Sequence, residues 1–499
     1  MVHAPVLTDL PSELLHLIFG HFCLHCRGGF REPYFVENDV GHDQSEAYLR
    51  DRHSLFSLCL VSRRMRDVAQ PVLHHEFVLG YAHLQPRWTY SWWGRLTSFI
   101  RTVSTRRDLA ALVKTVFFHP SLQEGVELGD AWRAMRYAAD ALQVDLAEVW
   151  KRRELDSRER RWRMLRVDYE LKRELFLGPF PSIDRVTHSR DLEALVPELF
   201  AVLLALLPNL KHLAFGTDTK TSLIGIRVLY WLPAAMSALG VTKLPLRILE
   251  THVRQGDLYK LTPDLESLTC DRIVVLKGFS FPRLKSLCIR DIGVGKRALG
   301  EITGFCPESL SSFTYETGER TRGGIVQPSD IVAQLSQFRG TLRSLHLDYR
   351  TPFILPKDIR MDFPCLEGFT VLESLFLTTN VIYHDSNLEL PDEDSLVDIL
   401  PPSIVSLTLA ETWWPTPAQR LMRGLLGLAE YKRRNPERFR KLKLVRFDTE
   451  EVCLDIPVKE AFGEAGIDLV YGEFPRKDWS YKDGHMKRSL RRIHGLGWQ

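Results

Sequence analysis

The sequence has few cysteines, no long hydrophobic run and no excess of one charge. Eight cysteines among 499 residues are too few for a disulfide framework, so we expect free thiols in a reducing compartment. The apolar run from Leu199 to Leu207 is far shorter than the ~20 residues that span a bilayer. At the N-terminus, Asp9 and Glu13 occur early and no basic run precedes an apolar stretch, so we expect no secretory signal. These absences predict an intracellular protein, cytoplasmic or nuclear, with no membrane partner.

The charge balance limits the expected partners. Lys and Arg number 66 and Asp and Glu 63, which gives a formal net charge of +3. Proteins that bind nucleic acid over a wide surface have a clear basic excess, so nucleic acid is not an expected partner. With 44% hydrophobic and 26% charged residues, the composition is that of a folded chain, long enough for about three domains or one repeat array.

Motifs of the common catalytic sites are missing as well. No G-x-S-x-G or H-E-x-x-H sequence occurs. Gly295-Lys296 is followed by Arg297, where a phosphate-binding loop has Ser or Thr, and His74-His75-Glu76 lacks the spacing of a zinc protease. We therefore predict that the chain is not an enzyme, has no catalytic residues and needs no cofactor.

A short pattern, L-x-x-L-x-L, returns along the C-terminal part of the chain. Clear copies begin at Leu210, Leu265, Leu284, Leu310, Leu342, Leu372 and Ile404, and weaker copies at Val113, Leu246 and Leu442. Apolar residues at helical spacing lie between the copies, and several copies follow a Pro or Gly that ends the preceding helix. Each repeat therefore predicts a helix, a tight turn and a short strand. Stacked repeats predict an α/β solenoid with a parallel sheet on its concave face.

Side chains alternate along a strand, so the leucines of each repeat should point into the core and the third, fifth and seventh positions to the concave face. The third position is Ser267, Ser286, Ser312, Ser344, Ser374 and Ser406 in successive repeats. This serine column either keeps adjacent strands close or belongs to a binding surface. The fifth and seventh positions vary in chemistry as a specific partner requires, and they supply the candidate target-binding residues Arg290, His346, Asp348 and Phe376.

The first 80 residues have a different pattern. Ser12 and Glu13 follow Leu10-Pro11 and suit the start of a helix, which continues through the apolar segment LLHLIFGHF. The apolar residues expected on one face of this helix are Leu14, Leu15, Ile18, Phe19 and Phe22. A second apolar segment at 55–61 runs into Ser62-Arg63-Arg64 and a further apolar stretch.

These two segments resemble the F-box, the adaptor-docking module of cullin-based ubiquitin ligases. The matching residues are Leu10, Pro11, Glu13, Leu14, Leu15, Ile18 and Phe19, then Leu58, Leu60, Val61, Ser62, Arg63, Arg64, Ala69, Pro71 and Leu73. The resemblance implies that a Skp-type adaptor, and through it a cullin, binds this set: Leu10, Pro11, Glu13, Leu14, Leu15, Ile18, Phe19, Leu60, Val61 and Pro71. Two features depart from the family pattern. Met65 stands where an aromatic residue is usual, and residues 24–53 are inserted between the halves, where we expect a surface loop.

Residues 186–475 resemble the leucine-rich-repeat family, although the asparagine that usually follows the motif is missing from every copy. An N-terminal helical F-box at 1–80 followed by an irregular leucine-rich-repeat α/β solenoid resembles the substrate receptors of ubiquitin ligases, an organisation common in fungal proteins of this size. The resemblance implies that the chain binds a target protein for ubiquitin-dependent degradation. The alternative is an interaction scaffold that acts outside any ligase.

Two further regions have open interpretations. Residues 81–185 are expected to be a helical and charged connecting region, in which the basic run at 151–173 forms either a solvated helix or a patch for an acidic partner. Residues 476–499 form a basic tail. An aromatic side chain on the concave face should be covered, and either a bound target or this tail could cover Phe376.

Cys23 and Cys26 have the C-x₂-C spacing of one corner of a zinc site, and His42, His53 and Cys59 follow within reach. Two interpretations are open. Either a zinc ion orders the insertion at 24–53, or Cys23 packs at the end of the first helix while the histidines lie in an exposed loop. One corner alone does not define four ligands, so no metal ligand is assigned from the sequence.

Overall fold

The structure is a computed structural model, and two compact units can be described in it. The described residues are 7–28, 39–78, 94–118, 126–155, 166–179, 195–215, 232–251, 256–271, 280–291, 296–317, 326–350, 364–383, 391–411, 418–448 and 455–472. The first unit consists chiefly of Met1–Thr251 and Asp257–Thr262, and the second of Pro263–Arg476. Helices and parallel strands alternate along both units, so the fold is α/β, as predicted.

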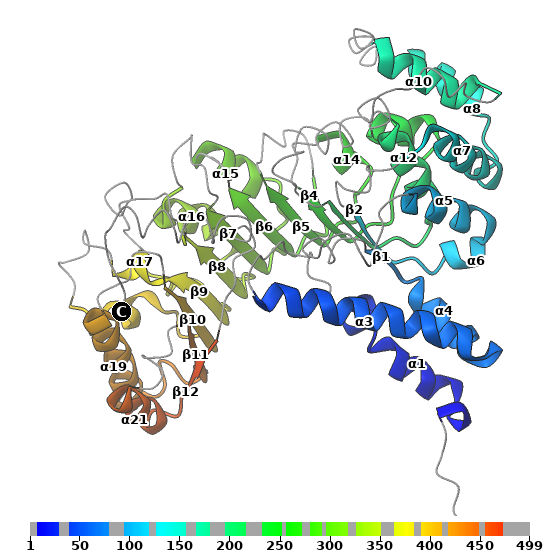
Figure 1. Ribbon diagram of the computed structural model, residues 1–499. Helices are drawn as coiled ribbons and strands as arrows, with labels where there is room; N and C mark the ends of the chain where they lie inside the picture. Colours follow the sequence, from blue (N-terminus) through cyan, green and yellow to red (C-terminus); the bar gives the residue numbers. More distant parts are fainter. Residues whose placement is uncertain are drawn as a thin grey trace, which may run out of the picture. The chain divides into compact units, whose positions relative to one another are not determined.

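Helices form the N-terminal part of the first unit (Figure 1). They are η1 (Leu7–Asp9), α1 (Ser12–Gly20), α2 (Leu24–Arg27), α3 (Asp39–Val61) and α4 (Arg63–Leu73). The Ser62 side chain accepts a hydrogen bond from the Met65 backbone N–H at 3.2 Å and so caps α4. One hydrophobic cluster joins the helices: Leu15, Phe19, Cys23, Leu55, Cys59, Met65, Val68, Ala69 and Val72. The two apolar segments at 10–22 and 55–73 therefore share one core.

Four parallel strands follow in the described part of the first unit, paired in chain order. They are β1 (Glu76–Val78), β2 (Thr115–Phe118), β3 (His212–Phe215) and β4 (Ile248–Thr251). The helices between and after them are α5 (Arg95–Thr105), α6 (Arg107–Ala110), α7 (Leu128–Leu142), α8 (Leu146–Leu155), α10 (Arg166–Leu177), α12 (Val196–Leu206) and α14 (Gly256–Lys260). The sheet thus begins at residue 76, well before the boundary at 186 predicted for the repeats. The weak copy at Val113 is a true strand, and the region 81–185 is not only helical.

The described part of the basic run at 151–173 is helical but not simply solvated. Arg153 on α8 pairs with Glu198 on α12, and the Lys172 Nζ on α10 lies 3.2 Å from the second carboxylate oxygen of Glu198. Glu198 is 1% exposed and Arg153 2%. Burial alone would raise the pKa of Glu198, but the two cations outweigh it and lower the pKa below its usual value. The run therefore supplies two inward cations that hold three helices together.

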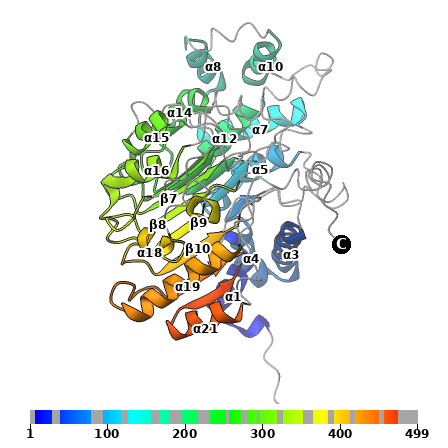
Figure 2. The same cartoon turned by 90° about the vertical axis from the view of Figure 1, so that its left-hand side faces the viewer.

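The second unit contains eight strands in its described residues, again parallel and paired in chain order (Figures 1 and 2). They are β5 (Ser267–Asp271), β6 (Ser286–Asp291), β7 (Ser312–Thr317), β8 (Ser344–Asp348), β9 (Ser374–Thr378), β10 (Ser406–Ala410), β11 (Leu444–Phe447) and β12 (Asp468–Tyr471). The intervening helices are α15 (Lys296–Thr303), α16 (Pro328–Leu335), η5 (Ser336–Phe338), α17 (Thr379–Ile382), α18 (Ser395–Ile399), α19 (Ala418–Arg434) and α21 (Ile456–Glu464). Helices α15 and α16 lie on one face of the strands in both views. This arrangement is the predicted solenoid-like stack of helix and strand.

The register of these strands follows the repeat alignment. Ser267 pairs with Ser286, Ser286 with Ser312, and the same column continues through Ser344, Ser374 and Ser406. The apolar residue that follows each serine, Phe313 after Ser312 and a leucine elsewhere, is buried, as alternation requires. The predicted columns of the third and fifth positions are therefore confirmed from β5 to β10.

The insertion at 24–53 differs from the predicted surface loop. Residues 24–27 form α2, and residues 39–53 belong to the long helix α3, so the loop prediction is wrong for both stretches. Residues 29–38 and the basic tail at 476–499 lie outside the described residues. None of the described helices is both long and apolar enough to cross a membrane.

Candidate functional site

Helix α1 has apolar side chains on two faces. Leu15 and Phe19, one turn apart, are 0% and 1% exposed and lie in the helical core. Leu14, Leu17 and Ile18 share the other face and are 45%, 68% and 37% exposed. Leu14, Leu17 and Ile18 therefore leave an apolar part of α1 that no other described residues cover.

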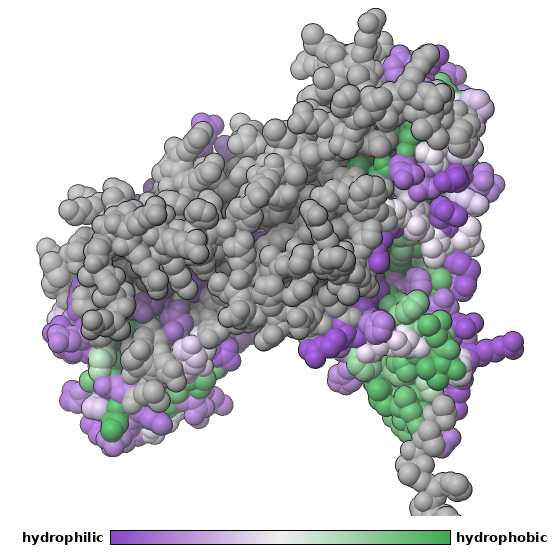
Figure 3. Space-filling view, in the orientation of Figure 1, coloured by the Kyte–Doolittle hydropathy of each residue, from purple (hydrophilic) through white to green (hydrophobic). Residues whose placement is uncertain are grey.

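Neighbouring elements extend this exposed face. Arg64 at the start of α4 donates a hydrogen bond from Nη2 to the Leu10 carbonyl oxygen at 2.5 Å, which holds the start of α1 near the α3–α4 junction. The end of α3 adds Phe56, Leu60 and Val61, which are 52%, 66% and 67% exposed. We name the following set the apolar helical surface: Leu7, Leu14, Leu17, Ile18, Phe56, Leu60 and Val61. A hydrophobic patch is visible over this region in Figure 3.

The structure divides the predicted adaptor-binding residues into two groups. Leu14, Ile18, Leu60 and Val61 are exposed with Pro11 and Glu13, whereas Leu15 and Phe19 fill the core. Leu10 is partly buried against that core, and Pro71 inside α4 is half-buried. The expectation that Leu14, Leu15, Ile18 and Phe19 share one face is therefore wrong, because Leu15 and Phe19 point to α3 and α4. Leu17 and Phe56 were missed, although Leu17 stands three residues after Leu14 on the same face.

The predicted target-binding residues lie together in the second unit, but mostly inside it. Phe376 is 8% exposed and stacks on the His346 ring with centroids 3.8 Å apart. Asp348 is 2% exposed and pairs with Arg350 at 2.9 Å, and the guanidinium carbon of Arg350 lies 5.5 Å from the Phe376 ring centroid. Arg290 is 3% exposed and pairs with Glu316 at 3.3 Å. Only His346 is half-buried, so these four side chains do not present an open surface.

Arg350 also connects distant repeats. Its Nη1 lies 3.7 Å from the Asp448 carboxylate, which follows β11, while its Nη2 contacts Asp348 at the end of β8. The backbone N–H of Glu411 donates to Asp448 at 2.7 Å. Burial raises the pKa of Asp448 to about 6 in spite of these contacts. Asp348, Arg350 and Asp448 therefore form a largely buried ion network, a structural element rather than an exposed recognition surface.

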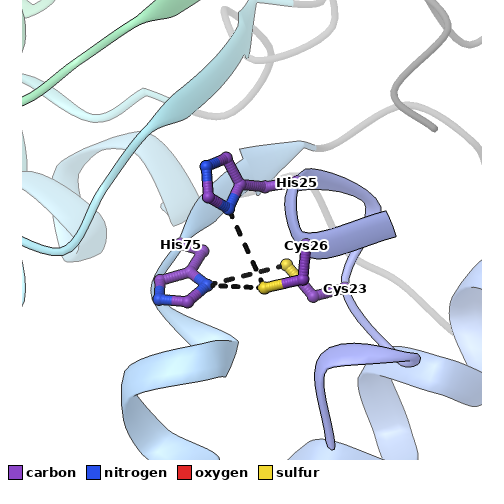
Figure 4. Close-up of side chains that lie close together, drawn as sticks. All are labelled: Cys23, His25, Cys26 and His75. Atoms are coloured by element: carbon purple, nitrogen blue, oxygen red, sulfur yellow. Dashed lines mark hydrogen bonds between the residues drawn. The ribbon is translucent and has the colours of Figure 1, made fainter. Parts of the chain in front are cut away.

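A second cluster lies in the first unit, where four side chains from separate segments converge (Figure 4). Cys23 directly precedes α2, His25 and Cys26 lie on α2, and His75 lies between α4 and β1. The Cys26 Sγ lies 3.2 Å from His75 Nδ1 and 3.8 Å from His25 Nδ1, and the Cys23 Sγ lies 3.9 Å from His75 Nδ1. All four atoms lie within 4.8 Å of one another. Such a set of thiol and imidazole donors can hold a metal ion.

Glu76 supports this cluster from its buried position at the start of β1. The backbone N–H of His25 donates to Glu76 Oε2 at 3.1 Å, and the Arg52 guanidinium lies 3.6 Å from Glu76 Oε1. The hydrogen bond between the two thiol groups, together with burial, raises the pKa of Cys23 to about 12. The same hydrogen bond lowers the pKa of Cys26.

Only some of the candidate zinc ligands predicted from the sequence belong to this cluster. Cys23 and Cys26 belong to it, whereas His53 is exposed on α3 and Cys59 lies in the helical core. The His42 side chain lies outside the described residues. The sequence interpretation missed His25 and His75. His25 lies inside the C-x₂-C corner itself, and that position was the available signal, but nothing in the sequence brings His75 to it.

Comparisons with known proteins do not assign a family to the chain. No protein-family model matches it, and no curated protein matches it either. Any function must therefore be argued from the surfaces and clusters described above.

Proposed function

We propose that the chain is the substrate-recognition subunit of a ubiquitin ligase of the adaptor–cullin–F-box type. In this proposal the apolar helical surface docks on a Skp-type adaptor, which connects the chain to a cullin, and the repeat strands bind a target protein. The observation that carries the proposal is the second apolar face of α1, which lies in the segment that resembles an F-box. Leu14, Ile18, Leu60 and Val61 belong both to that resemblance and to the exposed face.

The physical argument for a docking surface is the amount of apolar side-chain area that is exposed on these helices. Seven of the twelve large hydrophobic side chains that are exposed in the described residues belong to the apolar helical surface. Contiguous exposed patches of this kind mark protein interaction sites, because covering them with water is unfavourable by about 25 cal/mol per Å². A partner with a complementary apolar groove gains this energy without any change in the helical core beneath.

Such a receptor performs no bond chemistry of its own. It holds a target so that a separate conjugating enzyme can reach a lysine on it, which is catalysis by proximity. The proposal thus needs neither a catalytic residue nor a cofactor for this activity. The target is proposed to bind the repeat unit, but not through Arg290, Asp348 and Phe376, whose side chains are buried.

The alternative is an interaction scaffold that uses the same apolar surface for a different protein. The two proposals are separated by co-purification of the full chain with a Skp-type adaptor and a cullin from a eukaryotic extract. We expect both to be recovered with the wild-type chain and lost with the double variant Leu17→Ala/Leu60→Ala, since both leucines are more than half exposed.

The matched control is Ile456→Ala, because Ile456 is 68% exposed, like Leu17, but lies in the second unit. This control should retain both partners. Recovery of adaptor and cullin with the double variant would contradict the docking surface. Failure of the wild-type chain to recover an adaptor would favour the scaffold.

A further inference from the structure

We propose that Cys23, His25, Cys26 and His75 bind one zinc ion, which fastens the N-terminal helices to the first strand of the sheet. The proposal is independent of the ligase function. It concerns the four side chains that converge in Figure 4, where the sulfur atoms and the Nδ1 atoms of both imidazole rings face one another.

The spacing of the four atoms agrees with tetrahedral zinc. With Zn–S of about 2.3 Å and Zn–N of about 2.0–2.1 Å, tetrahedral ligand atoms lie about 3.3–3.8 Å apart. The sulfur–nitrogen separations in the structure are 3.2 Å and 3.8 Å for Cys26 and 3.9 Å for Cys23, and none of the four atoms is more than 4.8 Å from another. Shifts of a few tenths of an ångström, within the freedom of the side chains, would complete the site.

Hydrogen bonding alone explains this geometry less well. A thiol donates a single hydrogen, which accounts for one contact of each sulfur, and the Cys23 Sγ donates its hydrogen to Glu76 Oε2 at 3.6 Å. Such hydrogen bonding does not account for two sulfurs and two Nδ1 atoms around a common point, with Nδ1 of His75 within 4 Å of both sulfurs. Convergence of four donors is what a shared ion requires.

The chemistry of the donors selects the metal and the role. Two thiolates and two imidazoles suit zinc, whereas magnesium and calcium prefer oxygen ligands. Four protein ligands leave no position for water or substrate, which is typical of structural rather than catalytic zinc. The site is therefore expected to contribute to folding and not to a reaction.

Surrounding residues support the ligands as they do in known metal sites. The buried Glu76 carboxylate accepts a hydrogen bond from the His25 backbone N–H at 3.1 Å and so fixes the C-x₂-C corner on β1. Its charge is balanced by Arg52 on α3 at 3.6 Å, which reduces its repulsion of the nearby thiolates. Glu76 is thus a positioning residue for the site.

The position of His75 explains what the zinc would connect. The His75 carbonyl oxygen accepts hydrogen bonds from the backbone N–H groups of Lys114 and Thr115 at 2.7 and 3.1 Å, so His75 is already fixed to β2. Cys23 belongs to the core of the N-terminal helices. A zinc ion shared by the two would link segments that lie about fifty residues apart in the chain, and its binding energy would add to the stability of the fold.

The first test is the metal content of the full chain, purified without chelators and supplied with one equivalent of zinc before gel filtration. Elemental analysis should find about one zinc per chain. After removal of the zinc, added Co²⁺ should produce the visible absorption of a tetrahedral thiolate–imidazole cobalt site, which the zinc form lacks. Absence of both zinc and the cobalt spectrum from the folded wild-type chain would overturn the proposal, and this measurement needs no variant.

The second test assigns the ligands. Cys26→Ser and His75→Ala should each lose zinc, whereas the controls Cys365→Ser and His53→Asn should keep about one per chain. Both control residues are exposed and lie outside the cluster. Glu76→Gln keeps all four ligands and should weaken zinc affinity by about tenfold to a hundredfold in competition with a chromophoric chelator. Full zinc content in Cys26→Ser/His75→Ala would overturn the assignment.

Discussion

Leu17 on α1 and Phe376 on β9 are both large apolar side chains, but 68% of Leu17 is exposed and only 8% of Phe376. The neighbouring polar residues show the same contrast. Asp348 on β8 is buried to 2% exposure, whereas Glu13 on α1 is exposed. The strands bury charges and the helix exposes leucines, so polarity alone does not decide which residues form a surface in this chain.

The contrast arises because the strand residues have packed neighbours that the exposed face of α1 lacks. Helix α1 has nine residues and apolar side chains on two faces, and α3 and α4 cover one of them. In the strand stack, parallel register places each side chain beside the equivalent position of the next repeat, so His346 meets Phe376. Arg350, two residues after Asp348 and just beyond β8, pairs with both Asp348 and Asp448. The residues that remain exposed are those that no neighbouring helix or strand covers.

The largest expected effect compares two phenylalanines. Phe376→Ala should destabilise strands β8–β10 by about 3–5 kcal/mol, since it removes a buried ring and leaves a cavity. The measurement is the opening free energy of these strands by amide hydrogen exchange. Phe56→Ala, on a residue that is 52% exposed, should change the opening free energy of α3 by less than about 0.5 kcal/mol. Equal changes in opening free energy for the two substitutions would contradict the claim that Phe376 is buried and Phe56 is exposed.

The buried ion network should give the next largest effect. Arg350→Met keeps most of the side-chain volume but leaves the Asp348 and Asp448 carboxylates without their shared cation. Breaking a buried pair from one side costs about 3 kcal/mol or more, so urea should unfold the second unit at a clearly lower concentration. Arg343→Met is the control, because the Arg343–Glu373 pair is exposed. Equal urea midpoints for Arg350→Met and Arg343→Met would contradict a stabilising role of the network.

Asp448 should give a smaller, pH-dependent effect. Burial raises the pKa of this carboxyl from 3.8 to about 6 in the folded chain, so the folded state binds a proton that the unfolded state releases in this range. The stability contributed by Asp448 is therefore fully present below its unfolded pKa and falls as pH rises towards 6. As pH rises over this interval, the unfolding free energy of the wild-type chain should fall relative to that of Asp448→Asn, whose side chain does not titrate. A difference that is constant with pH would contradict the assigned burial.

The smallest effect on stability is expected at the apolar helical surface. Leu17→Ala and Leu60→Ala should each stay within about 0.5 kcal/mol of the wild-type unfolding free energy, because both side chains are mostly in water already. Leu15→Ala, on the opposite face of α1, should cost about 2–5 kcal/mol. Circular dichroism during urea unfolding compares the three. Similar losses for Leu17 and Leu15 would mean that both faces are packed.

The sequence predicted the repeats well because each copy repeats the same local pattern. Aligning L-x-x-L-x-L copies also aligns their strands, which is why the serine column appears in the observed register. Strand β1 has three residues and no leucine motif, so it gave no signal. Residues 39–53 contain few apolar side chains at helical spacing, so their helix was not expected either.

The sites were predicted less well because they depend on contacts between distant segments. The C-x₂-C corner is visible in the sequence, but the approach of His75 follows from the packing of α4 against α1 and of Val78 on β1 against Leu24 on α2. In the same way, Leu15 packs against α3 and α4, whereas Leu17 lies on the face of α1 that these helices do not cover. The burial of Asp348 and Phe376 depends on Arg350 and His346, whose roles no single strand reveals.

The most direct test of the docking proposal is a calorimetric titration of the full chain with a recombinant Skp-type adaptor. The wild-type chain should bind, and Leu17→Ala/Leu60→Ala should weaken the affinity by about thirtyfold or more, as expected for two anchors at the centre of an interface. The Ile456→Ala control should bind like the wild type. Unchanged affinity in the double variant, with the helices still folded, would contradict the claim that the exposed face of α1 and α3 is the adaptor-binding surface.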